Sequence, residues 1–161
     1  MMLEVSINTA DEMRELGKQL ASQLKDGDVV VLSGSLGAGK TTFSQGVGAG
    51  LGISDAITSP TYVVCRTHRP GSKNLALVHV DAYRLSVTDD LLDLDIDSIN
   101  PHVTLIEWGL DFVQKVSQSW LLVDIQRDNE SPDDLPESGP RTVKVTAHGL
   151  EWLNRKLEVR L

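Results

Sequence analysis

The sequence predicts an α/β fold, in which a mixed, largely parallel central sheet is flanked by helices. Short runs with strand character alternate with segments of helical periodicity along the whole chain. One run, Val29-Val30-Val31-Leu32, is unbroken and β-branched, as expected of a central parallel strand that is buried on both faces. No internal repeat and no linker is visible, so residues 1–161 are predicted to form a single domain.

The first half of the chain predicts two strands and two helices. Residues 3–7 alternate apolar and polar side chains, as in a strand. Thr9-Ala10-Asp11-Glu12 is a capping box, which starts a helix with an apolar face up to Leu24. After the strand at 29–32 and a glycine-rich loop, a second helix is predicted to run to about Leu51, where Gly52 ends it.

The second half predicts a hairpin followed by alternating helices and strands. Turn chemistry at 68–73 joins two predicted strands, at 62–67 and 75–81. The elements expected after the hairpin are an acidic helix at 87–97, a strand at 103–106, a helix at 110–116, a strand at 120–126, a strand at 141–146 and a terminal helix at 150–157. Residues 127–140 are rich in Asp, Pro, Ser and Glu and predict a flexible acidic loop.

Composition narrows the class of protein. The chain has 161 residues, of which 40% are hydrophobic and 24% charged, as in a soluble globular domain. A net charge of −8 argues against a broad, sequence-independent grip on nucleic acid, which needs Lys and Arg, and solubility is the simpler explanation of the charge. The single Cys65 excludes an intramolecular disulfide, and a small buried hydrophobe is favoured over a nucleophile. No signal peptide and no membrane-spanning run is visible, so the expected location is cytoplasmic, with no membrane contact.

The segment Gly34-Ser35-Leu36-Gly37-Ala38-Gly39-Lys40-Thr41 matches G-x-x-x-x-G-K-[ST] at every fixed position, which is the phosphate-binding loop of P-loop NTPases. Glycines let successive amides point at one phosphate, and the following helix adds the positive end of its dipole. Lys40 would neutralise the outer phosphates, and the hydroxyl of Thr41 would ligate Mg²⁺. Average composition would produce the pattern by chance in about 0.5% of chains of this length, so ATP binding is favoured over an empty glycine turn.

Two acidic residues end predicted strands beside this loop. Glu107 follows the largely apolar run Val103-Thr104-Leu105-Ile106, and a metal role there, as in a Walker B segment, is favoured over a solvated strand-end acid. Asp81 ends the strand at 75–81 in the same way. It is expected either to position water or hold metal in an outer shell, or to pair with Arg84 or cap a turn.

Other residues admit two interpretations. Ser59-Pro60-Thr61-Tyr62 could be a switch loop that senses the γ-phosphate or an ordinary proline turn. Trp108 is more typical of a core or interface than of base stacking, and His79 of a hydrogen-bonded structural histidine. Arg141 could stack on a base or pair with phosphate, although a surface cation is the simpler interpretation.

Four motifs follow one another along the chain: Gly34-Ser35-Leu36-Gly37-Ala38-Gly39-Lys40-Thr41-Thr42, then Thr58-Ser59-Pro60-Thr61-Tyr62, His79-Val80-Asp81-Ala82-Tyr83-Arg84-Leu85 and Ile106-Glu107-Trp108. Taken together they resemble the TsaE (YjeE) family, the ATPase component of bacterial tRNA threonylcarbamoyladenosine synthesis. Their order and spacing match the family from about residue 7 to residue 122.

The resemblance implies a small P-loop α/β domain that binds ATP and Mg²⁺. ATP would lie in the loop from Gly34 to Thr42, with Thr41 and Glu107 holding the metal. Thr9 matches a position near the adenine, Asp81 would lie near the reacting phosphate, and Arg141 matches a late basic nucleotide contact. The catalytic set would be Lys40, Asp81 and Glu107.

The resemblance also implies a function and partners. The protein would act with TsaD and TsaB in the cycle that modifies adenosine 37 of ANN-decoding tRNAs. It would meet tRNA only through that complex and would not itself transfer the threonylcarbamoyl group. ATP hydrolysis by the isolated protein would be slow, because no arginine finger or dedicated catalytic base accompanies the loop.

Two other classes of protein share the loop. A small-molecule kinase usually carries an arginine-rich lid, whereas residues 127–140 hold one arginine among five acids. A GTPase switch would need a guanine-reading Asn-Lys-x-Asp stretch, which the sequence lacks.

Overall fold

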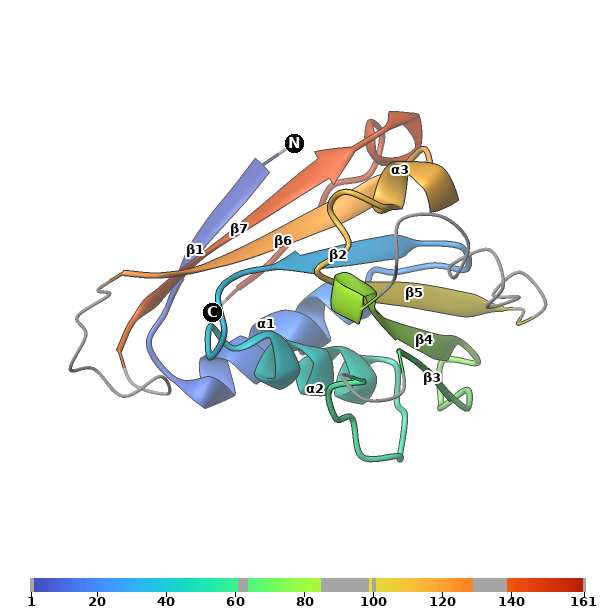
Figure 1. Ribbon diagram of the computed structural model, residues 1–161, viewed down its shortest axis with the longest axis horizontal. Coiled ribbons are helices and arrows are strands. Elements are labelled where there is room, and N and C mark those ends of the chain that lie inside the picture. Colours follow the sequence, from blue (N-terminus) through green and yellow to red (C-terminus); the bar gives the residue numbers. More distant parts are fainter. Residues whose placement is uncertain (1, 61–63, 85–98, 100, 129–138, 161) are drawn as a thin grey trace.

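The computed structural model describes residues 2–60, 64–84, 99, 101–128 and 139–160. Seven strands form one sheet in the order β1-β7-β6-β2-β5-β4-β3 (Figure 1). The strands are β1 (Met2–Ile7), β2 (Val29–Ser33), β3 (Cys65–His68), β4 (Ala76–Asp81), β5 (His102–Glu107), β6 (Trp120–Arg127) and β7 (Arg141–His148). The helices are α1 (Ala10–Ala21), α2 (Lys40–Gly50) and α3 (Val113–Val116), with 3-10 turns η1 (Ala82–Arg84) and η4 (Leu150–Trp152).

The sheet is mixed, with a parallel centre, as the sequence predicts. Strand β2 pairs in parallel with both β5 and β6, and β5 pairs in parallel with β4. The outer pairs, β1–β7, β6–β7 and β3–β4, are antiparallel. Every residue of β4 and β5 is buried, as expected of central strands covered on both faces, and this includes the polar residues His79, Asp81, His102, Thr104 and Glu107.

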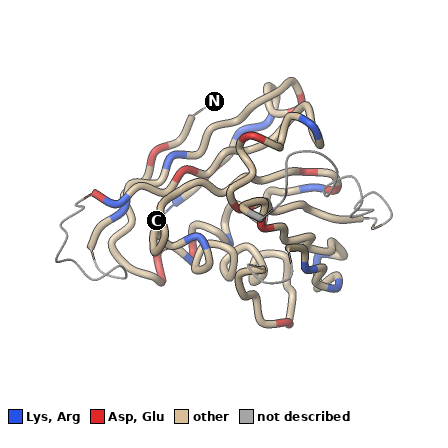
Figure 2. The backbone as a smooth tube through the Cα atoms, in the orientation of Figure 1, with Lys and Arg blue, Asp and Glu red and all other residues tan. Residues whose placement is uncertain are grey.

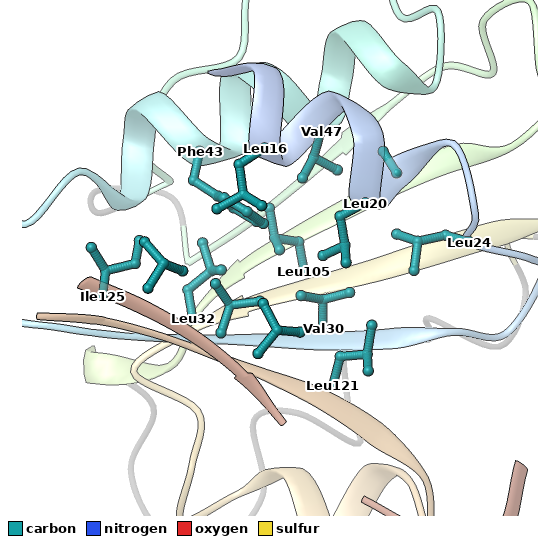
Figure 3. Close-up of a cluster of buried hydrophobic side chains, with 14 of the residues drawn as sticks. Leu16, Leu20, Leu24, Val30, Leu32, Phe43, Val47, Leu105, Leu121 and Ile125 are labelled. Carbon is teal, nitrogen blue, oxygen red and sulfur yellow. The ribbon is translucent and has the colours of Figure 1, made fainter. Parts of the chain in front are cut away.

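Helices α1 and α2 lie side by side on one face of the sheet (Figure 1). Their apolar side chains meet those of the central strands in the larger hydrophobic core (Figure 3). Truncation of a fully buried member such as Phe43 or Leu105 to Ala would cost about 3–5 kcal/mol. The helix α3 contributes Val113 to a second cluster on the opposite face, together with Val31 and Ile106 of the sheet.

Small residues bring α1 and α2 unusually close together. A Cβ atom at Gly17 would lie 2.4 Å from the carbonyl oxygen of Phe43, and one at Gly46 would lie 2.1 Å from the carbonyl oxygen of Arg14. No side chain fits in either place, so the two backbones are in direct contact. This contact sets the two helix N-termini next to each other.

The first helix begins at the predicted capping box. The Thr9 hydroxyl accepts a hydrogen bond from the Glu12 amide at 3.1 Å, and the Glu12 carboxylate accepts one from the Asn8 amide at 2.6 Å. Two amides at the start of α1 are therefore satisfied by side chains.

The predicted terminal helix at 150–157 is wrong. Only η4 is helical, and residues 155–160 form no helix or strand. They run along α1 and the residues just after it. The side-chain amide of Gln19 in α1 bonds both the backbone N–H and the C=O of Arg160, and that of Gln23, after the helix, does the same for Glu158. Leu157 and Val159 pack against the larger core. Their period of two, which is not a helical spacing, was the sequence signal for an extended segment.

Other boundaries differ from the prediction by small amounts. The helix expected at 110–116 shortens to α3, and the strand expected at 62–67 is described only from Cys65. Cys65 is half-buried, and burial raises the pKa of its thiol, which agrees with a packing role. The predicted acidic helix at 87–97 lies outside the described residues, as do residues 129–138 of the predicted flexible loop.

Charges of both signs are interspersed over the described elements (Figure 2). No helix in the part of the chain that the structure describes is long and apolar enough to cross a membrane.

Candidate functional site

The loop between β2 and α2 adopts the conformation that its glycines permit. The φ angles of Gly34, Gly37 and Gly39 are 144°, 76° and 116°, and residues that carry a side chain rarely adopt such positive values. A Cβ atom at Gly34 would also lie 2.6 Å from the carbonyl oxygen of Ile125 in β6. The loop thus passes against the sheet, and α2 starts at Lys40 directly after it.

Lys40 is folded back onto this loop. Its Nζ donates to the carbonyl oxygens of Gly34 at 2.7 Å and Ser35 at 2.9 Å, and it lies 4.1 Å from the ring centroid of Trp108. The residue is only 7% exposed. Burial lowers the pKa of Lys40, while the charges of Glu107 and Asp81 oppose that shift. The ammonium group is therefore held in the loop by two neutral carbonyl oxygens, whose place a charged phosphate could take.

The two candidate acids are cross-strand neighbours. Asp81 and Glu107 are paired in register at the carboxyl ends of the parallel strands β4 and β5, and Glu107 is also opposite Leu32 of β2. Both acids are buried. Glu107 Oε1 lies 2.9 Å from Nε2 of His79, so the predicted hydrogen bond of His79 is confirmed. Asp81 Oδ1 accepts the Tyr83 amide at 3.0 Å, which is the turn-capping alternative for this residue. Its other alternative, a pair with Arg84, involves a side chain outside the described part.

A cavity of about 620 Å³ lies over the loop and the strand ends. It is lined by Ile7, Asn8, Thr9, Ala10, Met13, Arg14, Leu36, Gly37, Ala38, Gly39, Lys40, Thr41, Thr42, Gln45, Ser59, Glu107, Trp108 and Arg141. Most residues predicted for nucleotide and metal binding are thus together. Three are not among the lining residues: Gly34 and Ser35, whose carbonyls hold Lys40, and Asp81, whose charge still reaches Lys40.

Arg141 begins β7 and reaches across to the loop. Its Nε donates to the Ala38 carbonyl oxygen at 3.2 Å, and its Nη2 lies 3.4 Å from that of Gly37. Burial lowers the pKa of Arg141, with a further contribution from its cross-strand neighbour Arg127. The structure therefore places this arginine in the cavity wall instead of on open surface.

Sequence reasoning did not name three of the polar lining residues: Asn8, Arg14 and Gln45. Arg14 Nη1 donates to Asp11 at 2.8 Å, and its Nε lies 3.4 Å from Gln45 Oε1, so a polar bridge links α1 to α2 at the cavity wall. The signal was available, because Arg14 lies one helical turn after Ala10 and Gln45 one turn after Thr41.

Trp108 is neither core nor free surface. It is 39% exposed, has a φ of 60°, and its amide donates to the Leu32 carbonyl oxygen at 3.2 Å. Its ring packs under Lys40 and lies 5.7 Å from the ring of Tyr83. A side chain held in the left-handed region is strained, and such strain is typical of functional sites.

The oxygen donors of the cavity fit a magnesium ion. Thr41 offers a hydroxyl and Glu107 a carboxylate, which are the hard ligands that Mg²⁺ takes. Among the described residues, no group of three or more His, Cys, Asp or Glu could hold a metal unaided. A metal bound here would share its coordination with water and a phosphate ligand, as Mg²⁺ does in nucleotide sites.

A mixed sheet whose parallel strand ends border a cavity, next to a strand–glycine loop–helix unit, defines an α/β protein with a candidate ligand site at the carboxyl edge of its sheet. The sequence places the chain more narrowly. The family model described as "Threonylcarbamoyl adenosine biosynthesis protein TsaE" matches residues 7–135, and the chain belongs to the TsaE family.

Individual relatives agree with this placement. The chain is 44% identical over 150 residues to the tRNA threonylcarbamoyladenosine biosynthesis protein TsaE of Streptomyces coelicolor, covering 91% of this chain and 98% of that protein. It is 34% identical over 125 residues to the protein of the same name from Bacillus subtilis, covering 78% of each. The crystal structure of Bacillus subtilis YdiB superposes with a TM-score of 0.71 and 29% identity, over 92% of this chain and 87% of that one.

Proposed function

We propose that this protein binds ATP with Mg²⁺, hydrolyses it slowly, and serves tRNA threonylcarbamoyladenosine biosynthesis. The observation that carries the proposal is that Lys40, Thr41 and Glu107, which come from α2 and β5, line one cavity over the glycine loop. The biosynthetic role rests on family membership and on the names of the relatives.

Each residue of the cavity has a distinct task in this proposal. Loop amides and the N-terminus of α2 would bind the phosphates, and Lys40 would leave the Gly34 and Ser35 carbonyls for the outer phosphates. Thr41 and Glu107 would hold Mg²⁺, which neutralises phosphate charge when bound. Thr9 would lie near the adenine, and Arg141 would contact the nucleotide from β7.

Slow hydrolysis agrees with the arrangement of the acids. Asp81 is the remaining acid at the strand ends, and we propose that it lies near the reacting phosphate, although its Oδ1 is engaged by the Tyr83 amide.

In the described part of the cavity wall, only Arg14 and Arg141 carry guanidinium groups, and both are bonded to neighbouring protein groups. We propose that TsaD and TsaB complete or exploit the site, and that contact with tRNA is indirect.

The test is nucleotide binding and hydrolysis by the parent protein and by Lys40→Ala, with Lys18→Ala as the matched control. Lys18 is an exposed lysine of α1, whereas Lys40 lies in the cavity. Loss of charge-assisted bonds to phosphate should weaken ATP binding by about 10- to 100-fold in Lys40→Ala alone.

Turnover should rise when TsaB and TsaD are added to the parent protein, and modified adenosine should disappear in cells that carry only Lys40→Ala. Equal ATP affinity of the parent protein and Lys40→Ala would overturn the assignment of the loop. Fast turnover without partners would overturn the proposed dependence on them.

A further inference from the structure

His79 is fully buried in the middle of β4 and bonded to the acid at the end of β5. Its Nε2 lies 2.9 Å from Glu107 Oε1, and its side chain is 0% exposed. His79 is opposite Leu105 in the parallel ladder, two residues before Glu107. The contact is therefore a diagonal one between two adjacent central strands, both of which are rigidly held in the sheet.

The surroundings of His79 determine which ring nitrogen carries the proton. A carboxylate only accepts hydrogen bonds, so Nε2 donates to Glu107. Among the described residues, Nδ1 has no hydrogen-bond partner. The Nε2–H tautomer leaves only a bare acceptor there, whereas the other tautomer would bury an unpaired N–H and turn a lone pair toward the carboxylate.

Glu107 borders the cavity, whereas His79 lies behind it in the protein interior. Glu107 lines it, and His79 is not among the lining residues. The imidazole thus holds one carboxylate oxygen from within the protein while the carboxylate itself borders the cavity. A glutamate has three rotatable side-chain bonds, and a charge-assisted bond from a buried, immobile donor removes much of that freedom.

We propose that His79 is a positioning residue, which holds the Glu107 carboxylate in place to receive the magnesium ion of a bound nucleotide. This inference rests on the proposed function of the cavity. Outer partners of metal-binding carboxylates commonly control metal affinity by 10- to 100-fold without touching the metal. We assign this role to His79 because, among the described residues, its side chain is the one that donates a hydrogen bond to the Glu107 carboxylate.

Three variants separate positioning from packing. His79→Leu removes the donor, and His79→Gln keeps an N–H group at the same number of bonds from the backbone. His68→Leu is the matched control, since His68 is also a buried histidine, lies on the neighbouring strand β3 and has its ion-pair contact with Asp55 instead of Glu107. Thermal unfolding of each variant without nucleotide shows which of them remain folded.

The measurement is ATP binding as a function of Mg²⁺, with EDTA as the metal-free arm. We expect His79→Leu to need about tenfold more Mg²⁺ than the parent protein, with metal-free ATP affinity changed by less than about twofold. His79→Gln should recover most of the difference, and His68→Leu should follow the parent protein. Coinciding Mg²⁺ curves for His79→Leu and the parent would overturn the proposal, and so would a His79→Gln curve no better than that of His79→Leu.

A second readout needs neither nucleotide nor metal. Long-range ¹H–¹⁵N spectra of the parent protein should show His79 as the Nε2–H tautomer, and Glu107→Ala should remove that preference. An Nδ1–H tautomer in the parent would overturn the proposal. Failure of the proposed function would look different: ATP binding by the parent protein would then not depend on Mg²⁺ at all.

Discussion

Arg155 forms a two-pronged ion pair with Asp28, which ties the C-terminal segment to the turn before β2. Nη1 lies 2.7 Å from Oδ1 and Nη2 lies 2.9 Å from Oδ2. The carboxylate is 5% exposed, and the guanidinium also stacks at 3.7 Å over the ring of Trp152. The same Nη2 donates to the Gln23 carbonyl oxygen, so one side chain joins the tail to the segment just after α1 and to the turn before β2.

Arg155→Ala should therefore lower the free energy of unfolding by about 2–4 kcal/mol, because it leaves the buried Asp28 carboxylate without its cation, and among the described residues only the Lys25 amide then donates to it. Urea unfolding at neutral pH measures the change. Arg160→Ala is the control, since that side chain is 90% exposed and its pair with Glu158 is long at 3.8 Å. Equal losses for the two variants would show that the tail contributes through bulk packing instead of through this pair.

Gly34→Ala should disrupt the loop. The added methyl group would meet the Ile125 carbonyl oxygen at 2.6 Å, and a φ of 144° is closed to alanine. We expect a loss of stability of about 2 kcal/mol or more, together with loss of ATP binding. Gly27→Ala is the matched control, because its φ is also positive but the added methyl group would meet nothing within 4 Å. A parental ATP affinity in Gly34→Ala would contradict the close passage of the loop against β6.

Arg141→Ala should weaken ATP binding by about tenfold while changing stability by less than about 1 kcal/mol, because its bonds to the loop carbonyls are long and partly exposed. Calorimetric titration with ATP and a urea unfolding curve measure the two effects. Arg127→Ala removes the cross-strand neighbour, which does not line the cavity, and should bind ATP like the parent. Weaker binding in both variants alike would point to the general positive potential instead of to Arg141.

His68 should make the fold sensitive to mild acid. Burial lowers its pKa below the ordinary 6.5, with further lowering from His79 and Arg66, whereas Asp55 opposes the shift. Because the unfolded chain binds this proton more readily, the His68 contribution is complete above about pH 6.5 and is lost as the pH falls through the folded-state pKa. Unfolding curves between pH 7.5 and about 5 should show a smaller acid loss in His68→Leu than in the parent. Parallel losses in the two proteins would assign the acid response to other groups.

Local sequence patterns correctly predicted the elements that depend only on nearby residues. The capping box at Thr9 and Glu12, the buried run at 29–32 and the glycine loop each depend on residues within a few positions. The C-terminal segment was predicted wrongly, because its course depends on Gln19, Gln23 and Asp28, which lie more than a hundred residues away. A helical pattern over so short a stretch could not compete with those bonds.

The sequence by itself determined which groups the site contains: a glycine-rich loop, the Lys40 ammonium, the Thr41 hydroxyl and two strand-end acids. Tertiary structure decided how these groups meet. Close packing of α1 on α2 put Arg14 and Gln45 in the same wall, and pairing of β4 with β5 set His79 behind Glu107. Such contacts depend on which elements become neighbours, and this is settled only when the whole chain buries its apolar surface together.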